Sequence, residues 1–374
     1  MTVTPVQSKA DLRAFVQFQY DLYRGNPAFV PPLRKDTYHA LNPHKNAFYE
    51  HGNIQPFLAR DASGAVVGRI AAIRNGMHLQ KYNDGVGFFG FFEAKDDPDV
   101  FRALIDAAAG WLKSQMLTAM RGPTNPSIND IAGMLVDGFG YPPSVLMPYN
   151  APYYEARLSE LGFERAMVMH SYFVHQKYLT IDKMRRGVDL VRRRYPTLRT
   201  RPIDMRRYDA EARLILDIYN EAWSDNWGSV PMTEAEFRQL AKELKQIIEP
   251  ELVVFVENEG VPIAFAVSIP NINQALKHVP EGRLAPLGLP KLLAYATFGA
   301  INEIRMPLMG VRKAYRGRGI DAVVILQSID NGLGKGYNAC EMSWILDNNT
   351  AMKNALEHLG GIRDKTYVML EKTF

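Results

Sequence analysis

Residues 305–321, RMPLMGVRKAYRGRGID, decide the fold of this chain. An apolar run ends at Val311, a short polar crossing follows, and Arg316-Gly317-Arg318-Gly319 then opens a predicted helix. Glycine lets the backbone pass close to a ligand, and the first N–H groups of a helix have no partner within the helix. Because two arginines add positive charge, this RGRG loop (Arg316–Gly319) predicts a binding site for a phosphate or pyrophosphate.

The pattern Val311-x4-Arg316-Gly317-x-Gly319-Ile320 resembles the coenzyme A pyrophosphate motif of the GNAT acyltransferase superfamily. The residues after it resemble the rest of that fold, with a helix over 321–333, a strand over 337–346, a further helix after Asn349 and a last strand near 366–370. The resemblance covers residues 251–374. It implies an α/β (α+β) fold, a mixed and mostly antiparallel sheet flanked by helices, with acyl-CoA (acetyl-CoA or a long-chain acyl-CoA) as co-substrate.

The resemblance also implies where coenzyme A binds. Backbone N–H groups near Met309 would hydrogen-bond the pantetheine or polarise the thioester carbonyl. This chain departs from the family at Asp321, where the family has Gly or Ala. A carboxylate beside a diphosphate is unfavourable unless it points away or caps the helix, and capping is the interpretation we prefer. The implied cofactor-binding residues are Met309, Gly310, Val311, Arg316, Gly317, Arg318, Gly319, Ile320 and Asn349.

The N-terminal half repeats this plan without the glycine-rich loop. The segment YYEARLSELGFER near Tyr154 parallels MKNALEHLGGIRD near Met352, and GFFGFFE precedes a helix as PLMGV does. Between them residues 95–99, KDDPD, carry three acids that would repel a diphosphate. We therefore predict two tandem GNAT-like domains: a degenerate domain without a cofactor site over residues 1–176, a basic linker and helix over 177–207, and an acyl-CoA-binding domain over 208–374.

Composition agrees with a folded protein of two domains in a reducing compartment. The chain has 374 residues, 47% hydrophobic, and a single cysteine, which rules out an internal disulfide. Because Cys340 lies in an apolar strand, we interpret it as a buried structural thiol. The chain shows neither a signal peptide nor an apolar run of about 18 residues, so we expect a cytoplasmic protein. The eight histidines show no metal-binding spacing, so we expect no metal.

Basic residues concentrate in the segment 177–207, and two interpretations of them stay open. They could contact phosphates of RNA, lipid head groups or coenzyme A, which the net charge of +4 and a peripheral membrane contact would suit. The simpler interpretation is a solvated helix face, with Met184, Val188 and Val191 forming a stripe that packs inward.

Direct attack of an amine on a thioester needs a base, and an acid can protonate the leaving thiolate. Many GNAT proteins carry a tyrosine acid in the last helix, and the matching position here is Leu356. The remaining catalytic candidates are Glu341, inside an apolar strand where its pKa would rise, His358 and Glu303. Glu341 could equally be an ion-pair partner of Arg305.

The acceptor is predicted from two sources. Trp223, Asn226 and Trp227 share a short polar segment after Asn220; they either cap the core or line a substrate pocket, and we favour the pocket. The stretches FFGFFEA, GPTNPSIND, LVDGFGYPP, NEAWSDNWG and EMSWILDNN resemble a group of bacterial tandem-GNAT proteins similar to bacterial ceramide synthases, which transfer a long acyl chain from acyl-CoA to a sphingoid amine.

The predicted function is therefore acyl-CoA-dependent transfer of an acyl group to a small-molecule or lipid amine, with no nucleic-acid partner. Two alternatives stay open: an aminoacyl-tRNA-dependent transferase of FemABX type, and a non-catalytic acyl-CoA-binding module. The sequence leaves open the acyl length, the acceptor, the oligomeric state and the role of the first domain.

Overall fold

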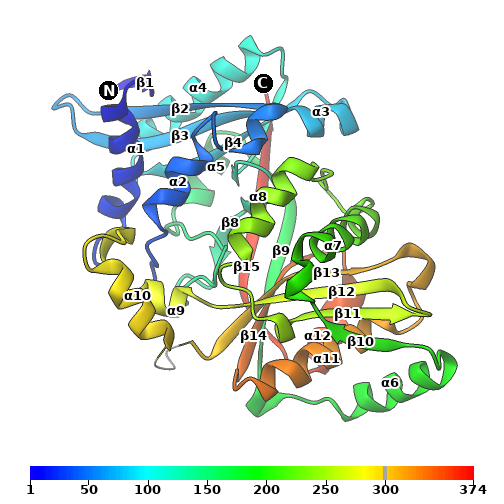
Figure 1. The fold of residues 1–374 in the computed structure, drawn as a ribbon. Helices are drawn as coiled ribbons and strands as arrows, with labels where there is room; N and C mark the ends of the chain where they lie inside the picture. The colour runs from blue at the N-terminus through cyan, green and yellow to red at the C-terminus, as the bar shows by residue number, and fades with distance from the viewer. Residues whose placement is uncertain (298–300) are drawn as a thin grey trace. The chain divides into compact units, whose positions relative to one another are not determined.

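The computed structural model describes residues 1–297 and 301–374, and the chain folds into two compact units. Unit 1 comprises Met1–Met169, Asn273–Tyr295 and Lys365–Phe374; unit 2 comprises His170–Ile272 and Ala296–Asp364. Strands β9 (Glu164–His175) and β15 (Ile362–Thr373) each pass from one unit to the other within their own length (Figure 1). The units are therefore not consecutive halves of the chain, and the domain limits at residues 176 and 207 stay predictions.

The sheet of unit 1 has the strand order β1-β2-β3-β4-β5-β15. The predicted helix after Pro98 is confirmed: Asp97 caps it by accepting a hydrogen bond from the N–H of Asp99 at 2.9 Å, and Pro98 supplies a φ suited to the first helical position. The elements of this unit are β1 (Thr2–Pro5), α1 (Lys9–Leu22), α2 (Arg34–Ala40), β2 (Gly52–Arg60), β3 (Val66–Asn75), α3 (Gly76–Tyr82), β4 (Val86–Ala94), α4 (Pro98–Ser114), β5 (Ala119–Gly122), β6 (Thr124–Asn125), β7 (Ile131–Ala132), β8 (Met134–Asp137) and α5 (Tyr154–Glu160).

The sheet of unit 2 has the order β9-β14-β13-β12-β11-β10. Strands β10 to β13 pair antiparallel, and β13 pairs parallel with β14. This mixed, mostly antiparallel sheet with flanking helices confirms the predicted fold class. Its elements are α6 (Asp182–Arg194), β10 (Arg199–Pro202), α7 (Tyr208–Trp223), α8 (Glu234–Leu244), β11 (Val253–Asn258), β12 (Val261–Pro270), β13 (Glu303–Val311), α11 (Ile320–Gly334), β14 (Ala339–Leu346) and α12 (Thr350–His358). Helices α9 (Asn273–Leu276) and α10 (Gly288–Thr297) lie between β12 and β13 in sequence and, up to Tyr295, belong to unit 1.

Alternation along the strands of unit 2 separates two faces of the sheet. Met306 and Met342 belong to the buried cluster that contains the inner side of α11 and Leu356 of α12. Gly310 faces the other way, because the β12–β13 register shifts between Arg305 and Leu308. A Cβ added to Gly310 would lie 2.8 Å from the ring of Phe265 and 3.2 Å from the Cβ of Ala222 in α7. We call these the α11 face and the α7 face.

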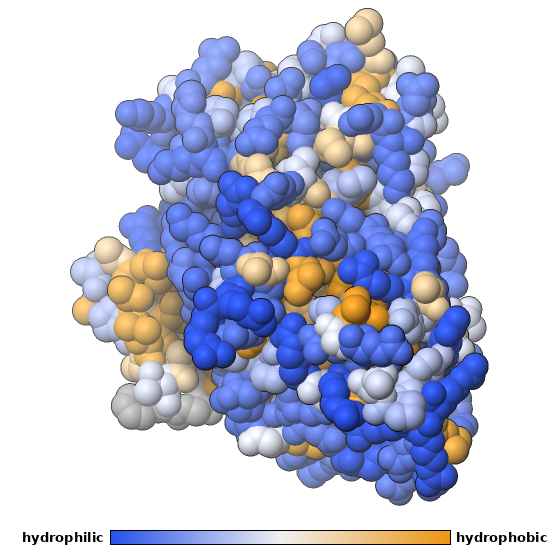
Figure 2. All heavy atoms as spheres, turned by 45° about the vertical axis from the view of Figure 1, so that its right-hand side comes forward, coloured by the Kyte–Doolittle hydropathy of each residue, from blue (hydrophilic) through white to orange (hydrophobic). Residues whose placement is uncertain are grey.

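One surface feature stands out against a mostly hydrophilic exterior. Figure 2 shows a hydrophobic patch beside the residues drawn in grey, in the segment that joins β12 to β13. Its exposed large side chains are Leu287, Leu289, Leu293 and Tyr295.

Candidate functional site

Strands β13 and β14 separate part of the way along their length. Their parallel pairing runs from Glu303 opposite Ala339 to Met306 opposite Met342, while β13 continues to Val311 and β14 to Leu346. Pro307 follows the last pair in β13 and has no N–H to donate, and the pairing of β13 with β12 is irregular at the same place. The two strands therefore leave an open edge between their C-terminal parts.

The open edge presents backbone polar groups. Arg312 donates to the carbonyl of Ile263 at 2.9 Å, so alternation along the antiparallel pair puts Met309 and Val311 at positions that do not bond to β12. Their N–H and C=O groups point toward the open edge. The indole N–H of Trp223, at the end of α7, donates to the carbonyl of Met309 at 2.9 Å. Trp223 therefore lies at the edge where the resemblance implies the thioester.

The RGRG loop carries β13 into α11 with two glycines in the left-handed region. Gly317 has φ +66°, and no described heavy atom lies within 4 Å of a Cβ added there. Gly319 has φ +78° and is the N-cap residue of α11. Within the described chain no side chain caps this helix, so the N–H groups of its first turn stay available to a ligand. The loop thus has the open space and the donors that a diphosphate needs.

The two arginines of the loop are placed differently from each other. Arg316 donates to the carbonyl of Ala222 and lies 3.8 Å from the carboxylate of Asp225, so its guanidinium holds the loop to the end of α7. Arg318 donates to the hydroxyl of Tyr195 at 3.1 Å. The predicted capping by Asp321 is wrong, because Gly319 is the N-cap residue; Asp321 is exposed in the first turn, where a negative charge favours the helix.

The basic helix α6 packs beside this loop. Val188 is buried and Met184 and Val191 pack against the same cluster, which confirms the inward stripe predicted from the sequence. A Cβ added to Gly319 would lie 2.7 Å from a methyl group of Val191. The last turn of α6, with the exposed residues Arg192–Arg194, therefore begins next to the start of α11.

A buried polar cluster lies on the α7 face where the strands begin to separate. Ser343 donates its hydroxyl to Glu341 at 2.9 Å and accepts from Nε of Arg305 at 2.9 Å. Glu341 is 1% exposed and lies opposite Arg305 in the strand register. The guanidinium of Arg305 also lies over the ring of Trp344, 5.3 Å from its centre. Glu341 could therefore act as a base or pair with Arg305, the two roles predicted from the sequence, because it is buried at the site and lies near Arg305.

The other two catalytic candidates lie elsewhere in unit 2. Glu303 begins β13, and its carboxylate accepts from the side-chain amide of Asn271 at 3.1 Å. His358 is exposed at the end of α12, with its ring nitrogen 2.6 Å from the carbonyl of Asn354. The predicted cofactor residue Asn349 caps α12 by accepting from the N–H of Met352 at 3.2 Å. These contacts lie at the start of β13 and at the two ends of α12, and the roles of the three residues in the site stay predictions.

The predicted acceptor-binding residues at the end of α7 and just after it differ in their surroundings. Asn220 accepts from the N–H of Met232 at 3.3 Å, which closes the turn between α7 and α8. Asn226 is exposed and Trp227 is half-buried. Among the four predicted acceptor-binding residues, Trp223 contacts β13 through its hydrogen bond to the carbonyl of Met309.

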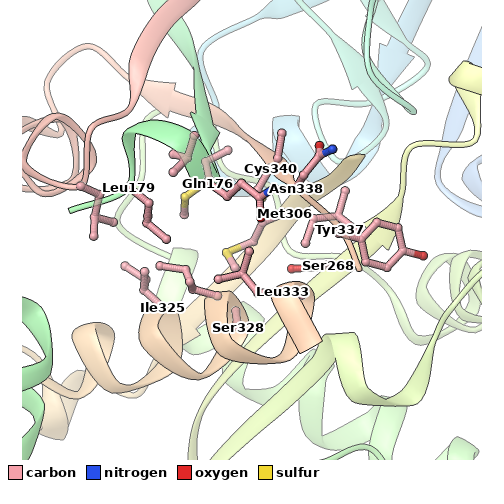
Figure 3. Close-up of a pocket in the computed structure, with 17 residues that line it drawn as sticks. Gln176, Leu179, Ser268, Met306, Ile325, Ser328, Leu333, Tyr337, Asn338 and Cys340 are labelled. Carbon is pink, nitrogen blue, oxygen red and sulfur yellow. The ribbon is translucent and has the colours of Figure 1, made fainter. Parts of the chain in front are cut away.

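A small apolar pocket lies between α11 and the starts of β13 and β14, on the α11 face (Figure 3). Its volume is about 50 Å³, below the roughly 300–1,000 Å³ of sites that hold drug-sized ligands. Cys340 lines it, and burial raises the pKa of this thiol to about 12, which suits a structural thiol and not a nucleophile. The hydroxyl of Ser268 also lines the pocket, with no hydrogen-bond partner in the described part of the chain.

Sequence reasoning missed one ionisable pair near the open edge. His170 of β9 is buried, and its Nε2 lies 2.9 Å from the carboxylate of Asp347, directly after β14. Hydrogen bonds from Lys353 and His170 lower the pKa of Asp347 to about 2. The Nδ1 of His170 is buried without a partner among the described residues. Because 177 positions separate the pair in sequence, no local motif could have indicated it.

The matching region of unit 1 is filled by the chain itself. Strands β4 and β5 pair parallel from Val86 to Phe88, after which β4 continues to Ala94. Asn125 accepts from the N–H of Phe91 at 2.5 Å, and a Cβ on Gly90 would lie 1.6 Å from the carbonyl of Thr124. Backbone of unit 1 thus occupies the edge that stays open in unit 2.

Two kinds of feature are absent from the described residues. Within residues 1–297 and 301–374, no group of three or more His, Cys, Asp or Glu side chains is arranged to hold a metal ion. In the same part of the chain, no helix has the length and apolar character needed to cross a membrane.

Comparison with solved structures shows the fold. The chain aligns with a tandem GNAT protein from the clavulanic acid biosynthesis pathway with a TM-score of 0.57 and 11% identity, over 100% of this chain and 98% of that one. It aligns with a GCN5-related glucosamine N-acetyltransferase region of a fungal multi-domain GH3 β-N-acetylglucosaminidase with a TM-score of 0.58 and 16% identity, over 99% of this chain and 38% of that one.

Comparison of sequences shows the family, although no protein-family model matches the chain. The chain is 39% identical to the bacterial ceramide synthase of Caulobacter vibrioides (strain NA1000 / CB15N), over 100% of this chain and 97% of that protein. It is 36% identical to Protein YghO of Escherichia coli (strain K12), over 98% of this chain and 93% of that protein. The chain therefore belongs to the bacterial ceramide synthase family, and it is an N-acyltransferase built on the tandem GNAT fold.

Proposed function

We propose that this protein transfers an acyl group from an acyl-CoA to an amine, with a long-chain sphingoid base as the acceptor. The observation that carries the proposal is the open edge between β13 and β14 directly before the RGRG loop. Diphosphate oxygens would accept from the first-turn N–H groups of α11, and the thioester carbonyl would accept from the N–H of Met309 or Val311. The acceptor class rests on the similarity of this chain to one relative, the bacterial ceramide synthase of Caulobacter vibrioides.

The amine nitrogen would attack the thioester carbonyl carbon, forming the C–N bond as the C–S bond breaks. We assign proton removal from the ammonium to Glu341, acting through the hydroxyl of Ser343 that it holds at 2.9 Å. Arg305 would keep that hydroxyl oriented. For protonation of the thiolate we propose His170, because its Nε2 lies 2.9 Å from Asp347, directly after the strand β14 that borders the open edge. Leu356, at the tyrosine position, is fully buried in the core.

We further propose that unit 1 binds no coenzyme A. Its counterpart of the open edge is filled by Thr124 and Asn125. Its counterpart of the RGRG loop is an acidic turn in which Asp97 caps α4 and Asp96 pairs with Arg157 at 2.8 Å. A diphosphate placed there would meet carboxylates in place of free N–H groups.

Calorimetric titration with coenzyme A, acetyl-CoA and palmitoyl-CoA, followed by thiol-release assays with sphinganine and with small amines, tests the proposal. We expect palmitoyl-CoA to bind more tightly than acetyl-CoA and sphinganine to stimulate thiol release. A preference for acetyl-CoA with small amines would replace the lipid acceptor by a small molecule. Binding of none of the three would refute acyl-CoA use and favour an aminoacyl-tRNA donor.

A further inference from the structure

The connection between β12 and β13 is much longer than the fold requires. The two strands are antiparallel neighbours, paired up to Pro270 opposite Ile304. Asn271 closes the base of the connection by donating its backbone N–H to the carbonyl of Glu303 at 2.9 Å. Hairpin connections usually take about 2–5 residues, whereas this one runs to residue 302 and contains α9 and α10. Long connections of this kind are uncommon unless they have a function.

The last part of this connection exposes large apolar side chains. Leu287 is 65% exposed, Leu289 47%, Leu293 56% and Tyr295 39%. Leu289 and Leu293 lie one helical turn apart on α10, so they point to the same side. Residues 286–297, PLGLPKLLAYAT, contain one charged residue, Lys291. These side chains form the patch visible in Figure 2, which we call the α10 patch (Leu287, Leu289, Leu293 and Tyr295).

Contacts within unit 1 hold this segment in place. The ring of Tyr295 stacks on that of His278 at 3.9 Å with 10° between the planes. Leu289 donates its N–H to the carbonyl of Leu284 at 2.6 Å, and a Cβ on Gly288 would lie 1.9 Å from the carbonyl of Arg283. Leu289 and Leu293 are therefore presented to the solvent by a helix that is held by contacts within its own segment.

The surroundings of the α10 patch are basic. Lys277, Arg283 and Lys291 are exposed in the segment 273–297, whose single acid is Glu281. Three arginines already surround that carboxylate: Arg34 at 3.0 Å, with Arg24 and Arg283 both at 3.5 Å. An apolar helix with a basic rim is typical of segments that lie in the interface of an anionic bilayer. A second copy of the patch would bring two basic rims together, which their repulsion disfavours.

We propose that the α10 patch docks the protein onto an anionic phospholipid bilayer. Leu287, Leu289 and Leu293 enter the boundary between head groups and acyl chains, while Lys277 and Lys291 pair with lipid phosphates. This docking site does not depend on which donor or acceptor the enzyme uses, so its test is separate from the test of the proposed function.

Flotation of the full chain with lipid vesicles tests this proposal. Vesicles of phosphatidylcholine containing phosphatidylglycerol should carry the wild type upward, and vesicles of phosphatidylcholine alone should carry much less. The double variant Leu289→Glu/Leu293→Glu should lose at least about tenfold in partitioning, because it places two charges in the interface. The matched control Ile362→Glu changes an aliphatic residue of β15 that is 62% exposed and lies outside the patch, so it should bind like the wild type.

Thermal unfolding and light scattering complete the experiment. Equal melting temperatures would show that the double variant is folded, and its loss of flotation would then support the docking site. Flotation that is equal in the double variant and the wild type, or absent from the wild type, would overturn the proposal. So would a wild-type dimer that becomes monomeric in the double variant without any binding to vesicles, because the patch would then be a contact between copies.

Discussion

Replacing Gly319 by alanine should damage the phosphate site in a way that the structure quantifies. The residue has φ +78°, a conformation that costs a non-glycine residue about 1–2 kcal/mol. Its new Cβ would also lie 2.7 Å from a methyl group of Val191, which is stiff because it is β-branched and helical. Overpacking of that kind costs about 1–3 kcal/mol. The sum, about 2–5 kcal/mol, is large enough to move the loop.

Gly317 supplies the matched control. It has φ +66°, but no described heavy atom lies within 4 Å of an added Cβ, so Gly317→Ala should cost only the conformational part, about 1–2 kcal/mol. The double variant Val191→Ala/Gly319→Ala removes the clashing methyl group and should regain much of the steric part as a coupling energy. Denaturant unfolding gives the stabilities, and titration with coenzyme A gives the affinities.

We expect Gly319→Ala to weaken coenzyme A binding by tenfold or more, since a loss of about 1.4 kcal/mol in binding free energy raises the dissociation constant tenfold. The reasoning would be refuted by equal losses in Gly317→Ala and Gly319→Ala, or by a double variant no better than Gly319→Ala alone. Unchanged coenzyme A affinity together with lowered stability would show that the loop does not bind coenzyme A, and would count against the proposed function.

Three further predictions concern the site. Glu341→Gln should lower kcat by about 100-fold or more and remove the acid limb of its pH profile, because the amide cannot accept the proton; an unaltered pH profile would contradict the assignment. His170→Gln should lower kcat with little change in KM, whereas His358→Ala should leave steady-state kinetics unchanged; the reverse result would exchange their roles. The double variant Arg192→Glu/Arg193→Glu should raise KM for acyl-CoA and reduce the salt dependence of that KM. If the variant and the wild type had the same KM at every salt concentration, a phosphate contact by α6 would be excluded.

Much of the fold could be predicted because local pattern and tertiary structure agree. The helix expected over residues 321–333 runs from Ile320 to Gly334, since Gly319 in the left-handed region fixes its start. The capping box Thr233-x-x-Glu236 starts α8 as its sequence indicates, with both reciprocal hydrogen bonds formed. Such signals lie within a few neighbouring residues, so sequence alone carries them.

Features of the site that depend on long-range packing could not be predicted. The loop motif indicated a phosphate site, but not that Arg316 would bond to the carbonyl of Ala222. The approach of Trp223 to the carbonyl of Met309 and the pairing of His170 with Asp347 join residues far apart in the chain. The separation of β13 from β14 depends on strand register, which is set by the neighbouring strands and not by the pattern of either strand.

The passage of β15 between the units has a consequence for synthesis on the ribosome. Its residues Lys365–Phe374 belong to unit 1, where Leu370 lies opposite Gly122 and is buried with Val368 in the core. Nascent domains usually fold in order from the N-terminus. Unit 1 cannot follow that order, because its sheet stays incomplete until translation has delivered the residues around Leu370. Its nascent residues should therefore expose apolar surface throughout elongation, which gives a chaperone a reason to bind unit 1 during translation.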